Sequence, residues 1–116
     1  MDNRDNSNPV QSVRTEGESL VVDVVGDIDL HRSLEFQQSL LKLLDRNPKR
    51  IVINLAGVPY MDSSGVASLV KLLSRVRRAN IVLKLCNLTD RVRSVFEITR
   101  LDTVFPICGS LQEALA

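Results

Sequence analysis

Residues 50–85 read RIVINLAGVPYMDSSGVASLVKLLSRVRRANIVLKL, and the pattern of apolar and polar residues in this stretch decides the fold class. Its first six residues form a largely apolar run of the kind that a buried parallel strand shows. A glycine and a proline then break the chain, and apolar residues recur at helical spacing from Val66 to Val76. A second apolar run, Ile81–Leu85, follows. The stretch therefore predicts two parallel strands joined by a helix that ends at about Ala79.

The sequence on either side continues this alternation. Before the quoted stretch, the β-branched run Ser19–Val25 predicts a strand, and the weaker pattern of Val10–Arg14 predicts a short edge strand that pairs with it as an antiparallel hairpin. A helix from Leu30 to Arg46 follows, and Pro48 stops it because proline cannot continue a helix. After the stretch, the sequence predicts a helix, a strand and a helix: Asp90–Thr99, Val104–Cys108 and Ser110–Ala116.

This order of elements predicts a single α/β domain with a mixed, mostly parallel sheet and an N-terminal antiparallel hairpin strand. About four helices are expected mainly on one face, because a chain of 116 residues can hardly cover two. Residues 1–9 are rich in Asn, Asp and Ser and are expected to be a flexible tail, which leaves residues 10–116 as the domain. Pro106 lies within the last predicted strand and favours an edge position for it.

In the first helix, apolar residues at helical spacing are predicted to form one stripe that faces the core. Its members are Leu30, Leu34, Leu41 and Leu44, with Leu40 beside it and Phe36 at its margin. At the other end of the chain, Ser110 and Glu113 have the spacing of a capping box, which predicts the start of the last helix.

The composition excludes several classes of function. A net charge of +1 and only four Phe and Tyr residues argue against direct binding to DNA or to single-stranded nucleic acid. One histidine and two separated cysteines, Cys86 and Cys108, leave too few ligands for a structural metal site and favour buried thiols in a reducing compartment. No secretory signal and no apolar stretch of ~18 residues is present, so we expect a cytoplasmic protein without a membrane span.

One segment of the chain is strongly basic. Residues 71–100 carry eight Lys and Arg residues and two acidic ones. They form either an ordinary solvated helix face or one half of a polar protein–protein surface. Motifs for small-molecule chemistry are missing: there is no GxGxxG, no GxxxxGK[ST] and no GxSxG, so no cofactor is expected.

The most informative segment joins the quoted strand to its helix and contains Asp62, Ser63 and Ser64. All three are residue types that cap helices, so capping is one interpretation. The other is modification, because two hydroxyls at a helix N-terminus lie where free N–H groups and the helix dipole favour a phosphate. A second loop, Gly26–Asp29, also follows a strand, and its two carboxylates either cap the next helix or line a site at the same sheet edge.

Together these loops resemble a known family. The segments GDID (26–29), IVINL (51–55) and YMDSSG (60–65) are similar to the anti-sigma factor antagonists of the STAS domain family, and the resemblance runs from about Val10 to Ala116. One departure is Val66-Ala67, where many family members carry Leu-Gly. Ala is the better helix former of the two small residues, and the change affects how closely a partner can approach.

The resemblance implies a partner-switching protein. In such systems an anti-sigma factor, which is also a serine kinase, is captured by the unphosphorylated antagonist, so that the sigma factor is released; phosphorylation ends the capture and a serine phosphatase restores it. Carried onto this chain, the phosphoacceptor is Ser63, and Ser64 has a structural role. Asp27 and Asp29, with the motif residues Asp62, Ser64 and Gly65, would contribute to the docking surface. The kinase brings the nucleotide, so this chain is a substrate and a ligand, not an enzyme.

Two rivals remain at this point. Within the family, some STAS domains are regulatory subunits of secretion or lipid-transport systems. Outside it, Ser63, His31 and Asp29 supply the residue types of a hydrolase triad, although no oxyanion hole is recognisable and so small a domain offers no evident substrate cleft.

Overall fold

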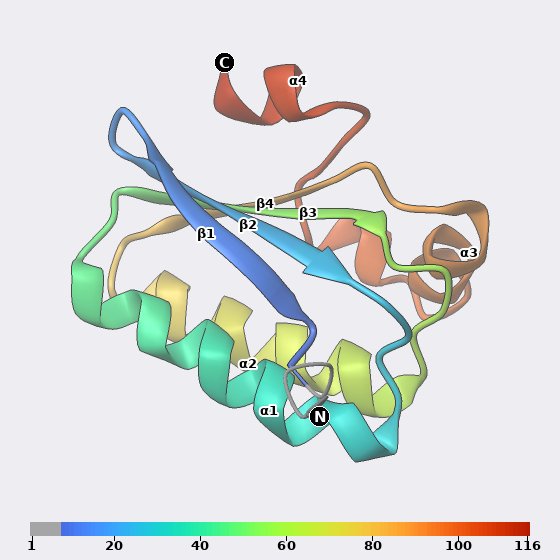
Figure 1. Ribbon diagram of the computed structural model, residues 1–116. Helices are drawn as coiled ribbons and strands as arrows, with labels where there is room; N and C mark the ends of the chain where they lie inside the picture. The colour runs from blue at the N-terminus through green and yellow to red at the C-terminus, as the bar shows by residue number, and fades with distance from the viewer. Residues whose placement is uncertain (1–7) are drawn as a thin grey trace.

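The computed structural model describes residues 8–116, and its strands form one five-stranded sheet in the order β1-β2-β3-β4-β5 (Figure 1). β1 and β2 are antiparallel, whereas every other neighbouring pair is parallel. The strands are β1 (Val10–Glu16), β2 (Ser19–Val25), β3 (Arg50–Gly57), β4 (Val82–Cys86) and β5 (Ile107–Cys108). The predicted mixed sheet with its N-terminal hairpin is therefore confirmed.

Four α-helices connect and cover the strands. They are α1 (Leu30–Lys42), α2 (Ser63–Arg78), α3 (Asp90–Ile98) and α4 (Leu111–Leu115), with 3₁₀ turns at Leu43–Arg46 and Leu101–Thr103. α1 and α2 lie side by side on one face of the sheet, α3 lies at its end, and α4 lies on the opposite face (Figure 1). The expectation that the helices lie mainly on one face is correct for α1 and α2, and α4 is the exception. Among the described residues, no helix has both the length and the apolar character that a membrane crossing requires.

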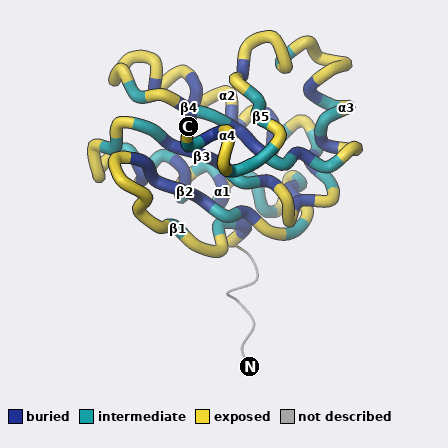
Figure 2. The backbone as a smooth tube through the Cα atoms, turned by 90° about the horizontal axis from the view of Figure 1, so that it is seen from above, coloured by how far each residue is buried: buried dark blue, intermediate teal, exposed yellow. Residues whose placement is uncertain are grey.

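The two faces of the sheet follow the period of two along each strand. On β2, Val22 and Val24 point into the large core beneath α1 and α2, whereas Val21 points to the other face. There it packs with Val52, Cys86 and Ala114 of α4 in a second, smaller cluster. From the side of α4, the central strands are mostly buried and the turns exposed (Figure 2). The domain thus has one main core and a small apolar patch under its last helix.

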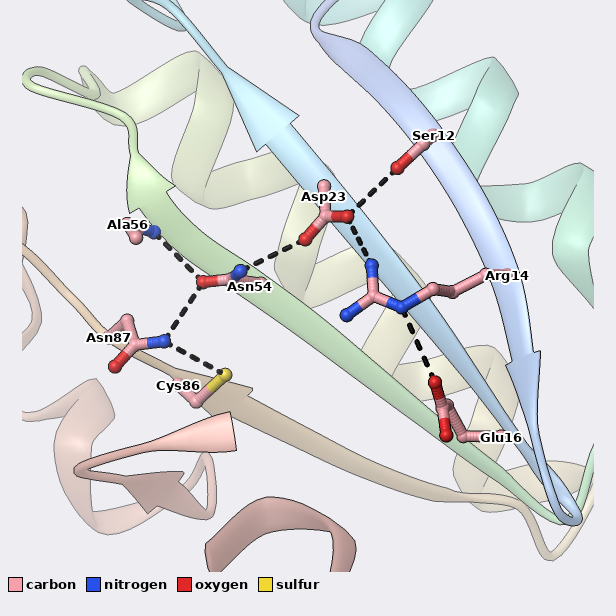
Figure 3. Close-up of polar contacts among 8 residues, drawn as sticks. All are labelled: Ser12, Arg14, Glu16, Asp23, Asn54, Ala56, Cys86 and Asn87. Carbon is pink, nitrogen blue, oxygen red and sulfur yellow. Dashed lines mark hydrogen bonds and ion pairs between the residues drawn. The ribbon is translucent and has the colours of Figure 1, made fainter. Parts of the chain in front are cut away.

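A row of polar side chains occupies part of the face that carries α4 (Figure 3). The Asp23 carboxylate accepts hydrogen bonds from Ser12 (2.8 Å), Asn54 (2.9 Å) and Arg14. Asn54 in turn accepts one from the side-chain amide of Asn87 at 3.1 Å. Burial alone would raise the pKa of Asp23, but the bonds from Ser12, Asn54 and Arg14 outweigh it and lower that pKa below the usual 3.8. The row therefore links β1 to the end of β4 through satisfied polar groups.

The buried side of α1 differs from the prediction. Phe36 and Leu40 are fully buried, whereas Leu30 and Leu34 are 74% and 62% exposed. Phe36, Leu40 and Leu43 are themselves spaced at i, i+4 and i+7, so the sequence contains two helical stripes. The stripe that contains the phenylalanine is the one that packs into the main core. The predicted stripe is therefore wrong for Leu30 and Leu34, whereas its other two members, Leu41 and Leu44, are partly buried and pack against the core.

Three local expectations at the ends of the domain have mixed outcomes. The last strand is only Ile107–Cys108, because the chain is still turning at residues 104 and 105 after the 3₁₀ turn at residues 101–103. Pro106 precedes that strand, and its carbonyl accepts a hydrogen bond from Leu85. The Ser110 hydroxyl does cap α4, accepting from the Glu113 amide at 3.1 Å.

The predicted N-terminal tail falls largely outside the described residues. Pro9, within the predicted range, is buried, and its carbonyl accepts a hydrogen bond from Val25.

Candidate functional site at the start of α2

The loops that follow β2 and β3 are joined to each other. Ile28 and Met61 form an isolated parallel bridge, in which the Ile28 amide donates to Tyr60 and the Asp62 amide donates to Ile28, each at 3.0 Å. Both bridging side chains are buried. The bridge continues the parallel pairing of β2 and β3 beyond the strand ends, and it brings the N-termini of α1 and α2 together. The expectation that the two loops share one sheet edge is confirmed.

Gly65 makes this close approach possible. It is buried in the first turn of α2, and a Cβ atom at this position would lie 2.6 Å from Met61 Cγ and 2.7 Å from Ile28 Cγ2. Contacts that short require the neighbouring side chains to move. The glycine is therefore a packing residue beneath the surface, and it allows the two loops to approach each other.

Asp62 is the N-cap of α2. Its carboxylate accepts from the Ser64 and Gly65 amides at 2.9 and 3.3 Å, and from the Ser64 hydroxyl at 2.5 Å. The Ser64 hydroxyl is the largest influence that lowers the pKa of Asp62 below its usual 3.8, and the backbone amides of Ser64, Gly65 and Leu30 lower it further against the effect of burial. Asp62 and Ser64 thus hold each other in place.

Ser63 lies between them and differs from both. It is the first residue of α2, its side chain is exposed, and its hydroxyl makes no hydrogen bond to any described residue. A primary hydroxyl at a helix N-terminus with no partner to displace is accessible to a modifying enzyme. The positive end of the helix dipole also favours the negative charge that a phosphate would bring there.

The two carboxylates of the other loop have different roles. Asp29 is the N-cap of α1, and its side chain accepts from the amides of His31 (3.0 Å) and Arg32 (3.2 Å). The Asp27 side chain is exposed and makes no hydrogen bond within the part of the chain described, although its carbonyl accepts from the Arg32 guanidinium at 3.2 Å. The capping interpretation therefore holds for Asp29 and not for the Asp27 side chain.

The residues of the hypothetical hydrolase triad do not assemble. The Asp29 carboxylate is bound to the backbone amide of His31, and no hydrogen bond between the His31 ring and Ser63 occurs among the described residues. The same residues contain no group of three or more His, Cys, Asp or Glu side chains that could hold a metal ion. The geometry of the described residues therefore gives no support to a triad of Ser63, His31 and Asp29.

Two features next to these loops are missing from the sequence-based prediction. The guanidinium of Arg91 on α3 stacks 5.2 Å from the centre of the Tyr60 ring, and the Thr89 hydroxyl donates to the Val58 carbonyl at 2.9 Å. These contacts hold the start of α3 against the loop before Asp62. The other feature is the exposure of Leu30 and Leu34. The sequence contained one indication of it: Leu30 directly follows the capping residue Asp29 at the start of α1.

Comparison with known proteins identifies the family. The model of the STAS domain matches residues 10–114. A protein of Bordetella bronchiseptica that is named "Putative anti-sigma factor antagonist BtrV" is 27% identical over 84% of this chain and 84% of its own length. The anti-sigma-B factor antagonist of Staphylococcus aureus is 30% identical over 75% of this chain and 81% of its own length.

Solved structures share the fold. SpoIIAA, described as an anti-sigma factor antagonist, superposes in its unphosphorylated form with a TM-score of 0.75 at 21% identity, covering 90% of this chain and 91% of SpoIIAA. The phosphorylated form of the Bacillus protein superposes with a TM-score of 0.68 at 20% identity, covering 90% and 95%. With a domain match that spans nearly all of its length and the joined loops that the motif residues build, this chain belongs to the STAS domain family.

Proposed function

We propose that this protein is a cytoplasmic anti-sigma factor antagonist that works by partner switching. Its unphosphorylated form binds an anti-sigma factor that is also a serine kinase, and the sigma factor is thereby released. The kinase transfers the γ-phosphoryl group of ATP to Ser63 Oγ, with release of ADP and the hydroxyl proton, and a serine phosphatase removes the group again. The names of the Bordetella and Staphylococcus relatives support the role.

The observation that carries the proposal is the contrast between two adjacent serines. Ser64 Oγ is bound to Asp62 at 2.5 Å, whereas the Ser63 hydroxyl is exposed and without a partner among the described residues. A kinase can reach Ser63 without disturbing the helix cap, but it would have to break the cap to reach Ser64. In this proposal Ser63 is the acceptor, and Ser64 is part of the support that holds it.

The physical basis of the switch is charge at the docking surface. A phosphate on Ser63 adds about −1.5 to −2 charges at pH 7. It would stand beside Asp62 and on the same sheet edge as Asp27 and Asp29. A partner that closes over it must desolvate this charge near several carboxylates, which opposes binding. The helix dipole offsets part of the charge in the free domain, so the fold remains intact.

The test uses the cognate kinase with ATP, followed by mapping of the modified peptide by mass spectrometry. Phosphate is expected on Ser63 in the wild type and in Ser64→Ala, and none in Ser63→Ala. Phosphate on Ser64 would contradict the assignment.

Titration calorimetry then tests the switch itself. Ser63→Asp should bind the kinase about a hundredfold more weakly than the wild type, a loss of ~2.7 kcal/mol, while circular dichroism shows both folded. Equal affinities would reject switching at this residue.

A further inference from the structure

One side of α1 exposes apolar side chains that do not contribute to the core. Leu30 and Leu34 lie one turn apart on the same side of the helix, and both are largely exposed, at 74% and 62%. Phe36 and Leu40 already supply the contact of α1 with the sheet. The side that carries Leu34 continues along the helix to Leu41, where a shallow depression is lined by Gln38, Leu41, Lys42 and Asp45. A contiguous exposed apolar patch, unlike a single exposed apolar residue, is a mark of a binding surface.

This surface adjoins the proposed phosphoacceptor. The backbone N–H of Leu30 interacts with the carboxylate of Asp62, the residue before Ser63. On α2, the exposed Ala67 lies one turn after Ser63. Because its side chain is a single methyl group, it does not screen the Ser63 hydroxyl from a partner. The Ser68 hydroxyl donates to the Ser33 carbonyl at 3.2 Å, which fixes the two helices against each other there. The start of α1, which carries Leu30, therefore lies at the same sheet edge as the Ser63 hydroxyl.

We propose that Leu30 and Leu34 form an apolar anchor that docks the anti-sigma factor, separately from the Ser63 switch; this inference rests on the proposed function. The anchor gives affinity for the partner, and the charge state of Ser63 decides whether docking is completed. A few side chains that become fully desolvated near the centre of an interface contribute most of its binding energy, whereas the contacts around them contribute less.

The charges beside the anchor define the chemistry of the partner surface. Asp27 is exposed, and the carboxylates of Asp29 and Asp62 lie at the same sheet edge. The Arg32 guanidinium is directed back to the Asp27 carbonyl. A complementary partner presents an apolar pocket for the two leucines with basic side chains at its rim.

The test compares exposed leucines at the site with an exposed isoleucine elsewhere. The variants are Leu34→Ser and the double variant Leu30→Ser/Leu34→Ser, and the matched control is Ile98→Ser at the end of α3, where the side chain is 81% exposed. Each is titrated calorimetrically with the purified cognate anti-sigma factor in the presence of ADP. We expect roughly tenfold weaker binding for the single variant and a hundredfold for the double variant. The control should stay within about twofold.

Steady-state phosphorylation adds a second readout. In the double variant the KM for this protein as substrate should rise with little change in kcat, because the anchor acts on binding and leaves Ser63 in place. Circular dichroism and thermal melts should be unchanged, since both leucines are on the surface.

The outcomes separate the two proposals. If Ser63→Asp abolishes binding and the double leucine variant binds like wild type, the anchor is wrong and the proposed function stands. If unmodified wild type fails to bind the kinase, the proposed function fails and the anchor with it. If light scattering finds a wild-type dimer that the leucine variants convert to monomers without loss of kinase affinity, the surface pairs two copies of this chain and the kinase assignment is overturned.

Discussion

Gly65 at the start of α2 lies so close to Ile28 in the preceding loop that a Cβ atom would come within 2.7 Å of the Ile28 Cγ2 methyl. Ile28 is at the same time bridged to Met61 through backbone hydrogen bonds. The two loops at the ends of β2 and β3 therefore behave as one packed unit. The exposed positions around them, Asp27 and Ser63, owe their relative placement to that packing.

Gly65→Ala should lower the free energy of unfolding by about 1–3 kcal/mol, the usual cost of overpacking a well-filled interior. Urea unfolding followed by circular dichroism measures it. Gly109→Ala is the matched control, because a Cβ there meets nothing closer than 3.4 Å and the backbone is in an ordinary conformation. If the two variants are equally stable, Gly65 is not needed for the approach of the two loops.

In the loop after β2, replacing one carboxylate should affect mainly stability and replacing the other should affect mainly binding. Asp29→Ala removes the N-cap of α1 and should cost about 1 kcal/mol of stability. Asp27→Ala should leave the melting temperature unchanged, because its side chain has no hydrogen bond within the described residues, yet it should weaken kinase binding by roughly 1–3 kcal/mol. Thermal melts and calorimetry on the same preparations decide this. A large loss of stability in Asp27→Ala would show that its carboxylate supports the fold.

The lowered pKa of Asp62 predicts a direction for acid sensitivity. A carboxyl group whose pKa in the folded protein is below its usual 3.8 stabilises the fold above that value, and this contribution is lost as the pH falls through the folded pKa. Asp62→Asn keeps a good N-cap residue but cannot titrate. Wild type should therefore lose more stability than Asp62→Asn between about pH 5 and the acid side of the folded pKa. A constant difference between the two unfolding curves over this range would contradict the prediction.

The two cysteines should react very differently. Burial is the main cause that raises the pKa of Cys86 to about 11, and the thiolate is the reactive form. Cys108 is half-buried beside it on β5. At pH 8, iodoacetamide should modify Cys108 in the native protein and reach Cys86 only after addition of denaturant, which intact-mass spectrometry resolves. Modification of native Cys108→Ser at the wild-type rate would show that Cys86 is accessible after all.

Much of the fold and of the candidate site could be predicted from local sequence patterns. The apolar runs of β3 and β4 and the stripe of α2 were readable because each has the period of its own secondary structure. The helix caps could be predicted because they are also local: Asp62 and Ser110 accept hydrogen bonds from amides two or three residues ahead. Such bonds depend on the nearest neighbours alone, so the start of α2 and its adjacent serines could be located without coordinates.

The limits of the sequence are clearest in α1. Its residues contain two stripes at helical spacing, and the local pattern does not say which one meets the sheet. The bridge between Ile28 and Met61 and the burial of Phe36 set the rotation of the helix, and both involve residues that are distant in the chain or across the core. The choice of the buried side was therefore made by tertiary packing, which placed Leu30 and Leu34 outside.

The same division applies to the three motif residues after Asp62. The sequence by itself determined that a capped helix begins there and that two hydroxyls stand in its first turn. The bond between Ser64 and Asp62 is equally local, whereas only the tertiary structure decided that Gly65 is pressed against Ile28 and that Ser63 is left exposed. The physical reason is that hydrogen-bond spacing is a local property, whereas exposure depends on what the rest of the chain brings against each side of the helix.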